Sequence, residues 1–305
     1  MIKTNTLFIL GAGASSPFGY FTNVQLRTAI CNHEMQSTVV RAITPPYDNE
    51  DWYYKSYNKF IDEFAKSGLY SIDFFLEHRT EYMNMGKMAI AANLIQFETD
   101  ERLRKVEGNW CIYLYNRLKS SFDDFDKNSI SFITFNYDRS LEQFLFEAIK
   151  ACFNKPHNEC AEKIRNIPIV HLYGQLDPLP WQDEQGVAYS SNERSILRLK
   201  KAIENIKLIN NERDINKNQG FQNAYKLIKK AKIIYFLGFG FDETNLERLN
   251  IELMTNKSIR ATAFGLEISK QRWIKRYFQK KAKVIIYLFP ESDSLTLLQK
   301  DLNIE

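Results

Sequence analysis

The stretch LFILGAGASSPFGYFTN, residues 7–23, decides the fold prediction. A short apolar run leads into Gly11 and Gly13, and small polar residues follow ahead of a segment with helical spacing. A Gly-x-Gly turn after the first strand of a doubly wound sheet lets the backbone approach a pyrophosphate, whose charge the next helix N-terminus stabilises. Ser16 stands where the third glycine of the dinucleotide fingerprint would fall, so a plain tight turn is the alternative.

Other short apolar runs have the length and composition of buried strands, and each leads into a helical pattern such as residues 141–150 or 244–254. The six predicted strands span residues 6–10, 130–135, 167–172, 232–237, 260–264 and 283–288. Strands that are apolar on both faces and separated by helices are typical of a parallel sheet covered on two sides. We therefore predict an α/β fold with a doubly wound, Rossmann-like, mostly parallel six-stranded sheet.

The strand pattern stops between residues 44 and 128, where aromatic residues recur at helical intervals, as in WYYKSYNKFIDEFAKSGLY (52–70) and NWCIYLYNRLKSSF (109–122). We predict that residues 44–128 form an inserted helical subdomain and that residues 1–43 and 129–305 form the Rossmann-like domain. Phe74, Phe75 and Tyr82 of the insertion are either core residues or a contact for a partner.

The composition excludes several classes of protein. The chain has 305 residues, 44% hydrophobic and 26% charged, which is typical of a globular protein and not of a disordered one. Its four cysteines stand far apart with no C-x-x-C pair, so we expect reduced thiols and no metal site. No signal peptide or run of about 18 to 20 apolar residues is present, which predicts a soluble, cytoplasmic protein without a membrane span.

Charge is unevenly distributed along the chain. The formal net charge is +4, yet residues 194–283 contain 21 Lys and Arg against 8 Asp and Glu. Such a basic segment can mark a surface for nucleic acid or for an acidic partner protein. Lysines along solvated helix faces are the alternative, because no aromatic interleaving or nucleic-acid motif accompanies them, and direct nucleic-acid binding stays open.

Polar groups follow three further predicted strands, in TFNYDRSLE (134–142), VHLYGQ (170–175) and FLGFGFDETN (236–245). In open α/β sheets the ligand crevice lies outside the carboxyl ends of the strands, so these segments are expected to converge there. Each also has a structural interpretation. Asp138 can cap the following helix, His171 can be a structural histidine, and Gly238 with Gly240 can form a turn.

Taken together, these motifs resemble the sirtuin-like NAD-binding domains, particularly those of bacterial antiphage defence proteins. The resemblance is carried by GAGAS (11–15), FNYD (135–138), a His followed shortly by Gly (171–174), GFGFDETN (238–245) and the helical segment SIDFFLEHR (71–79). Two features of sirtuin deacylases are absent: the paired C-x-x-C zinc module, and the acidic-arginine segment, where this chain reads SPFGYFTN (16–23). These departures argue against protein deacylation.

The resemblance implies roles for individual residues. Asn136 and Asp138 would face the nicotinamide ribose and carboxamide, and His171 would be the general base. Glu267 would accept a hydrogen bond from a ribose hydroxyl, although a surface glutamate is an equal alternative. The expected NAD contacts are Gly11, Ala12, Gly13 and Ser15 at the phosphates, and Gly238, Phe239, Gly240 and Asn245 along the adenosine side.

The reaction that the resemblance implies is hydrolysis of NAD, as a substrate, to nicotinamide and ADP-ribose. The nicotinamide–ribose bond breaks through an oxocarbenium-like transition state, as in glycoside cleavage. Asn136 can fix a water or a ribose hydroxyl, and a histidine can accept a proton near neutral pH. A non-catalytic module that binds NAD or ADP-ribose, and a residual deacylase or ADP-ribosyltransferase, are the alternatives.

The resemblance also implies a role in antiphage defence through depletion of NAD, an activity that needs control. No sensor domain is recognisable after the last predicted strand. We therefore expect control by self-assembly into a homo-oligomer, or by a partner protein such as an ATPase or a nucleic-acid-sensing component.

Overall fold

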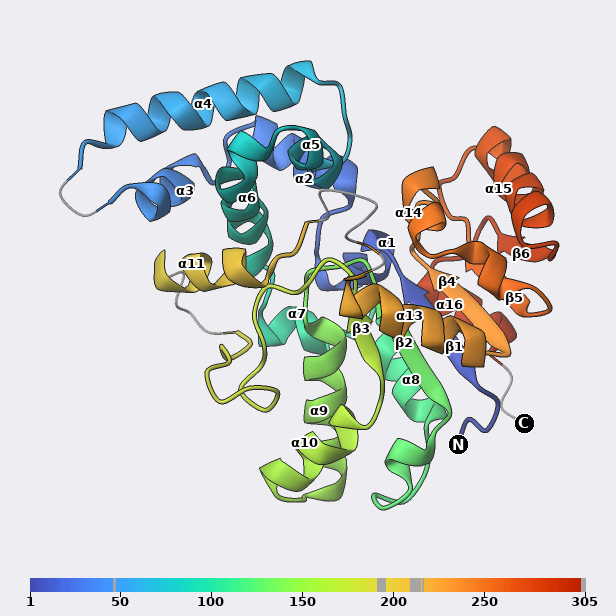
Figure 1. Ribbon diagram of the computed structural model, residues 1–305. Coiled ribbons are helices and arrows are strands. Elements are labelled where there is room, and N and C mark those ends of the chain that lie inside the picture. The colour runs from blue at the N-terminus through green and yellow to red at the C-terminus, as the bar shows by residue number, and fades with distance from the viewer. Residues whose placement is uncertain (46–47, 191–195, 209–214, 216, 303–305) are drawn as a thin grey trace.

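A computed structural model describes residues 1–45, 48–190, 196–208, 215 and 217–302 (Figure 1). It contains a six-stranded sheet in the order β3-β2-β1-β4-β5-β6, in which all neighbouring strands are parallel. The strands are β1 (Thr6–Leu10), β2 (Ile130–Thr134), β3 (Ile169–His171), β4 (Ile233–Leu237), β5 (Ser258–Thr262) and β6 (Ile286–Phe289). The predicted Rossmann-like α/β fold is confirmed.

The strand order reverses at β1, which lies in the middle of the sheet. Leu10 at its end is in register with Thr134 of β2 and with Leu237 of β4. The carboxyl ends of these three strands therefore lie level with one another. In a doubly wound sheet, a ligand crevice is expected at such a switch point.

Helices cover both faces of the sheet. α8 (Trp110–Arg117) contacts α9 (Ser140–Phe153) and α16 (Ser294–Asp301), and α10 (His157–Arg165) packs on α9. α13 (Gln219–Lys230) contacts β3, and α15 (Ile268–Lys281) contacts β6. Right-handed crossovers place the helices that follow β2 and β5 on opposite faces, which makes a three-layer arrangement.

Several predicted elements differ from the structure at their ends: β2 and β4 are each one residue shorter than predicted, and β5 lies at residues 258–262 and not 260–264. β3 is shorter than residues 167–172, because Pro168 has no N–H for a sheet hydrogen bond. β6 begins later than residue 283, because Lys283 has a φ of 53°, outside the strand region. The predicted helix 244–254 is two pieces, α14 (Glu243–Arg248) and a 3-10 turn (Ile251–Met254), since Asn250 between them has a φ of 50°.

A group of helices packs beside the sheet, at the upper left of Figure 1. Residues 44–128 contribute α4 (Glu50–Lys66), α5 (Ile72–His78) and α6 (Met83–Ile95) to this group, whereas α7 (Asp100–Arg104) and α8 contact α9. α2 (Asn23–Cys31), α3 (Gln36–Ile43) and α11 (Ile196–Asn205), from outside that range, also contact α6. The domain boundaries therefore stay a prediction.

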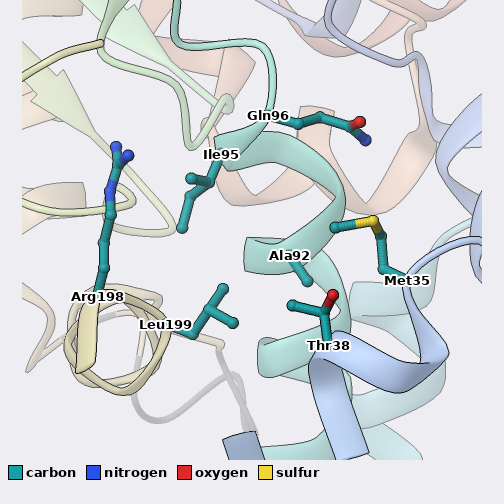
Figure 2. Close-up of a pocket in the computed structure, with 7 residues that line it drawn as sticks. All are labelled: Met35, Thr38, Ala92, Ile95, Gln96, Arg198 and Leu199. Carbon is teal, nitrogen blue, oxygen red and sulfur yellow. The ribbon is translucent and has the colours of Figure 1, made fainter. Parts of the chain in front are cut away.

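α6 is buried along most of its length, from Met88 to Ile95, as expected for a helix that is apolar on all sides. Among the helices in the described ranges, none has the length and apolar character needed to cross a bilayer. A cavity of about 10 Å³ lies between α3, α6 and α11, lined by residues that include Met35, Ala92 and Leu199 (Figure 2). A space of this size holds about one water molecule, so it is no site for a nucleotide.

A buried charged triad joins the helical group to the sheet. Arg139, just before α9, donates to both carboxylate oxygens of Glu98, at 2.8 and 2.5 Å, and both side chains are 0% exposed. Arg198 of α11 donates to the same carboxylate. Arg139 also donates to the backbone carbonyls of Asp177 and Val187, so its donors are matched by several acceptors.

Backbone turns at the ends of β1 and β4 approach each other closely. A Cβ on Gly11 would lie 2.6 Å from the carbonyl oxygen of Gly238, and a Cβ on Gly13 would lie 2.8 Å from its Cα. Gly238 has a φ of 57°, and a Cβ there would lie 2.0 Å from the amide nitrogen of Ala14. The glycines at these positions are therefore required by the contact between the two turns.

Gly238→Ala is expected to destabilise the protein by at least about 2 kcal/mol, because the left-handed backbone and the backbone overlap both oppose a side chain. The measurement is urea unfolding followed by circular dichroism. Gly240→Ala is the matched control: a Cβ there meets nothing within 4 Å, so its change should stay within about 0.5 kcal/mol. Equal losses in the two variants would contradict the steric explanation.

Candidate functional site

The side chain of Asn136 connects the end of β2 to the end of β1. Its Nδ2 donates to the carbonyl oxygen of Gly11 and to Oγ of Ser15, both at 2.9 Å. The backbone amide of Asn136 donates to Oγ1 of Thr134, which holds the loop at the strand end. Asn136 is therefore fixed by three hydrogen bonds, two from its side-chain amide and one from its backbone amide.

Asp138 lies next to this amide and is buried. Its Oδ2 accepts a 2.5 Å hydrogen bond from Ser15 Oγ, and its Oδ1 accepts from the amide of Ser140 at 3.1 Å. Burial raises the pKa of the Asp138 carboxyl, although these hydrogen bonds act in the opposite direction. Asp138 thus stabilises the start of α9, in line with the structural interpretation, and its contact with the nicotinamide ribose or carboxamide stays a prediction.

His171, at the end of β3, is held at both ring nitrogens. Nδ1 lies 2.9 Å from the carbonyl oxygen of Asn136, and Nε2 lies 2.5 Å from Oε1 of Glu142. Burial lowers the pKa of His171, but the Glu142 carboxylate, the Asn136 carbonyl and Asp138 together outweigh burial and raise this pKa above its usual value. With an acceptor at each nitrogen, the ring is arranged to donate from both, as an imidazolium does.

Four of the predicted residues therefore meet in one hydrogen-bonded group at the ends of β1, β2 and β3. We call this group the Asn136 cluster, and it consists of Ser15, Asn136, Asp138 and His171. The buried carboxylate of Asp138, and that of Glu142 beside the cluster, adjoin a fixed amide and an imidazole there. Such a set can orient hydroxyl groups, stabilise positive charge and exchange a proton.

The backbone amides of the glycine turn after β1 donate hydrogen bonds within the protein. The amide of Gly11 donates to the carbonyl oxygen of Leu237 at 3.0 Å, and that of Gly13 donates to Gly238 at 2.9 Å. Ala12 is half-buried and begins α1 (Ala12–Ser15). The plain structural role of this turn is thus evident, and contact with the phosphates of NAD stays a prediction.

The predicted residues after β4 have different surroundings. Phe239 is buried and packs against Phe135, Phe236 and Phe241, whereas Gly240 is exposed. Asn245 in α14 accepts a 2.7 Å hydrogen bond from the hydroxyl of Tyr173, which links the ends of β3 and β4.

Glu267 lies apart from these contacts, exposed at the start of α15, and its side chain does not cap that helix. This arrangement is the one expected for a surface glutamate. A hydrogen bond from a ribose hydroxyl to Glu267 stays a prediction.

Helix α5 contributes two acidic residues that sequence reasoning missed. The helix begins where the side chain of Ser71 accepts from the amide of Phe74. Asp73 then accepts from the hydroxyl of Tyr137, and Glu77 makes a bidentate pair with Arg248, with both distances 2.9 Å. The signal in the sequence was the Asp-x-x-x-Glu spacing within SIDFFLEHR, which places both carboxylates on one helix face.

The contacts of α5 extend across the strand ends. Arg248 also donates to the hydroxyl of Tyr173 at 2.8 Å, and Tyr173 donates to Asn245. α5 is therefore bonded to the loop after β2 through Tyr137 and, through Arg248, is connected to Tyr173 after β3.

Glu142, the partner of His171, was also not predicted from the sequence. It follows Asp138 by four residues in TFNYDRSLE and lies on the buried face of α9, with its side chain 2% exposed. A charged residue on the apolar face of a helix was the signal, because such a group needs a partner.

The larger of two cavities described here lies beside β3 and not over the strand ends. Its volume is about 480 Å³, and its lining includes Glu142, Arg165, Ile169, Trp181 and Lys226. Glu142 therefore faces this groove as well as His171. Within the described ranges, no three His, Cys, Asp or Glu side chains are grouped to hold a metal ion.

Asp73→Asn is expected to stabilise the protein above pH 6 by up to about 3 kcal/mol, since one pKa unit corresponds to about 1.4 kcal/mol. Burial raises the pKa of Asp73 to about 6, against 3.8 in an unfolded chain. Between these pH values the folded protein retains a proton that the unfolded chain has lost, so the stability of the native protein falls as pH rises.

Urea unfolding at pH 4, 6 and 8 measures this effect. The gain of Asp73→Asn should disappear near pH 4, where Asp73 is protonated in the folded state. Asp123→Asn, at an exposed position, is the control and should show no such pH dependence. A constant difference between Asp73→Asn and the native protein at all three pH values would show that this carboxyl titrates normally.

Comparisons with known proteins agree with the geometry of the strand ends. The family model of the SIR2-like domain matches residues 130–282, half of the chain, from β2 to the end of α15. The match includes Asn136, Asp138 and His171, and the turn after β4. No curated protein matches the chain. SIR2-like domains bind NAD and are generally NAD-dependent enzymes. The chain belongs to the SIR2-like family.

Proposed function

We propose that this protein is an NAD glycohydrolase, which cleaves the nicotinamide–ribose bond of NAD with water to give nicotinamide and ADP-ribose. The observation that carries the proposal is the Asn136 cluster, in which an amide and a carboxylate after β2, a hydroxyl after β1 and an imidazole at the end of β3 share hydrogen bonds. The cluster lies at the topological switch point, where α/β folds bind nucleotides.

The charges around the cluster suit this reaction. Cleavage develops positive charge on the ribose, as in glycoside hydrolysis. Asp138 and Glu142 are buried carboxylates next to Asn136 and His171. Fixed negative groups of this kind stabilise such a transition state more strongly in a site that excludes water.

Asn136 and His171 have different roles in the proposed reaction. Asn136 orients a water molecule or a ribose hydroxyl through its amide. His171 takes the proton of the attacking water at Nδ1, after the substrate has displaced the carbonyl of Asn136 from that nitrogen. The new bond joins the water oxygen to the ribose C1′ while the C1′–nitrogen bond breaks, and nicotinamide leaves as a neutral base. A positioned base contributes about 10²- to 10⁴-fold.

The proposal extends to the biological role. NAD depletion by such an enzyme would act in the cytoplasm as an antiphage defence, with activity controlled by homo-oligomer formation or by a partner such as an ATPase or a nucleic-acid-sensing protein. The excess of Lys and Arg over residues 194–283 supports an acidic partner. Direct contact of this basic segment with nucleic acid belongs to the same proposal.

A non-catalytic NAD-binding module is a second candidate, and one observation favours it. Both ring nitrogens of His171 are hydrogen-bonded within the protein, so the base is not free in this arrangement. A module of this kind would bind NAD or ADP-ribose and signal to a partner without cleaving the nucleotide.

Incubation of the purified protein with NAD, followed by chromatography of released nicotinamide, separates the two candidates. Asn136→Ala and His171→Ala are each expected to lower the rate by at least about 10²-fold, because each removes a group that acts on the ribose. Calorimetry should show that both variants still bind NAD.

Asn116→Ala and His157→Ala, at exposed positions on α8 and α10, are the matched controls and should retain the native rate. Absence of nicotinamide release from the native protein, alone or with its partner, combined with measurable binding of NAD, would decide for the binding module.

A further inference from the structure

The two ring nitrogens of His171 meet acceptors of different kinds. Nε2 lies 2.5 Å from a carboxylate oxygen of Glu142, and Nδ1 lies 2.9 Å from the backbone carbonyl of Asn136. Hydrogen bonds to an ionised acceptor are roughly twice as strong as those between neutral groups. The proton on Nε2 is therefore held more firmly than the proton on Nδ1.

The burial of Glu142 favours its pairing with His171. The side chains of Glu142 and His171 are 2% and 9% exposed. A carboxylate in such a position loses its hydration, and leaving it without a charged partner is strongly unfavourable. The ring is consequently fixed through Nε2, while Nδ1 points to the side of Asn136.

The other groups around the His171 ring do not provide a charged acceptor at Nε2 as Glu142 does. Asp138, in the loop before α9, adds negative charge and acts in the same direction on His171. The loop after β2 supplies the uncharged carbonyl of Asn136, and α13 brings Lys226 to the groove that Glu142 also lines. This groove gives the Glu142–His171 pair a route for proton exchange with solvent.

We propose that Glu142 is the positioning residue of His171: it holds the ring through Nε2 and directs proton exchange to Nδ1, the nitrogen on the Asn136 side. The use of Nδ1 in catalysis rests on the proposed function, whereas the pairing itself is a property of the folded chain. A carboxylate that orients an imidazole in this way also stabilises the imidazolium that forms when the free nitrogen takes a proton.

The pairing is tested by nitrogen NMR of the full-length protein with labelled histidine. The chain has four histidines, and His171→Gln identifies the signals of this ring. In the native protein, His171 should titrate above the usual pH and lose the proton of Nδ1 first. In Glu142→Gln, which removes the charge and keeps the shape, the titration should move to lower pH.

Two further variants make this result specific. Glu147→Gln, on the same helix and half-buried, is the control and should leave the His171 titration unchanged. Glu142→Asp keeps the charge and should restore part of the native titration. An unchanged titration in Glu142→Gln, with native circular dichroism, would overturn the proposal.

The pH profile of nicotinamide release tests the catalytic consequence. Glu142→Gln should move the acidic limb of the profile to lower pH and lower the plateau rate between about tenfold and 10⁴-fold, the larger value being that of the carboxylate in a serine protease triad. A purely structural role of Glu142 would lower thermal stability without moving the limb, which would contradict the proposal.

The two proposals fail in distinguishable ways. If the native protein releases no nicotinamide but the His171 titration depends on Glu142, the glycohydrolase is wrong and the positioning of His171 stands. If nicotinamide is released and Glu142→Gln changes neither the titration nor the pH profile, the glycohydrolase stands and the positioning role is wrong.

Discussion

The close approach of two backbone turns, at Gly11 and Gly13 after β1 and at Gly238 after β4, is the constraint on which the site depends. These turns are joined by hydrogen bonds from the amides of Gly11 and Gly13. The contact fixes the start of α1, which carries Ser15 to Asp138 and Asn136. A side chain on any of these glycines would separate the turns and move Ser15 away from its partners.

The polar groups at the strand ends form hydrogen bonds with one another within the protein. Asn136, Asp138 and His171 all have partners within the protein, and α5 adds contacts through Asp73 and Glu77. A substrate must therefore replace existing hydrogen bonds, and the groups that remain are already oriented. Preorganisation of this type lowers the reorganisation required during reaction.

The sequence was sufficient for the fold and for part of the site. Apolar strands separated by helices predict the parallel sheet, and the position of a strand end places Asn136 and His171 at one edge. The partners Glu142, Glu77 and Arg248 were not predicted, because such pairs join segments far apart in the chain. The ring of Phe239, in the turn after β4, belongs to an aromatic cluster of the core, a packing role that its position after a glycine did not indicate, and its contact with the adenosine side stays a prediction.

The triad of Arg139, Glu98 and Arg198 has a consequence for how the molecule opens. If the helical group separated from the sheet while each part stayed folded, Glu98 would keep Arg198 of α11, but Arg139 would become a buried cation without a charged partner. The free energy of such an uncompensated charge makes partial opening unfavourable relative to complete unfolding. Hydrogen exchange in α6 and in α9 should consequently report a single cooperative unit.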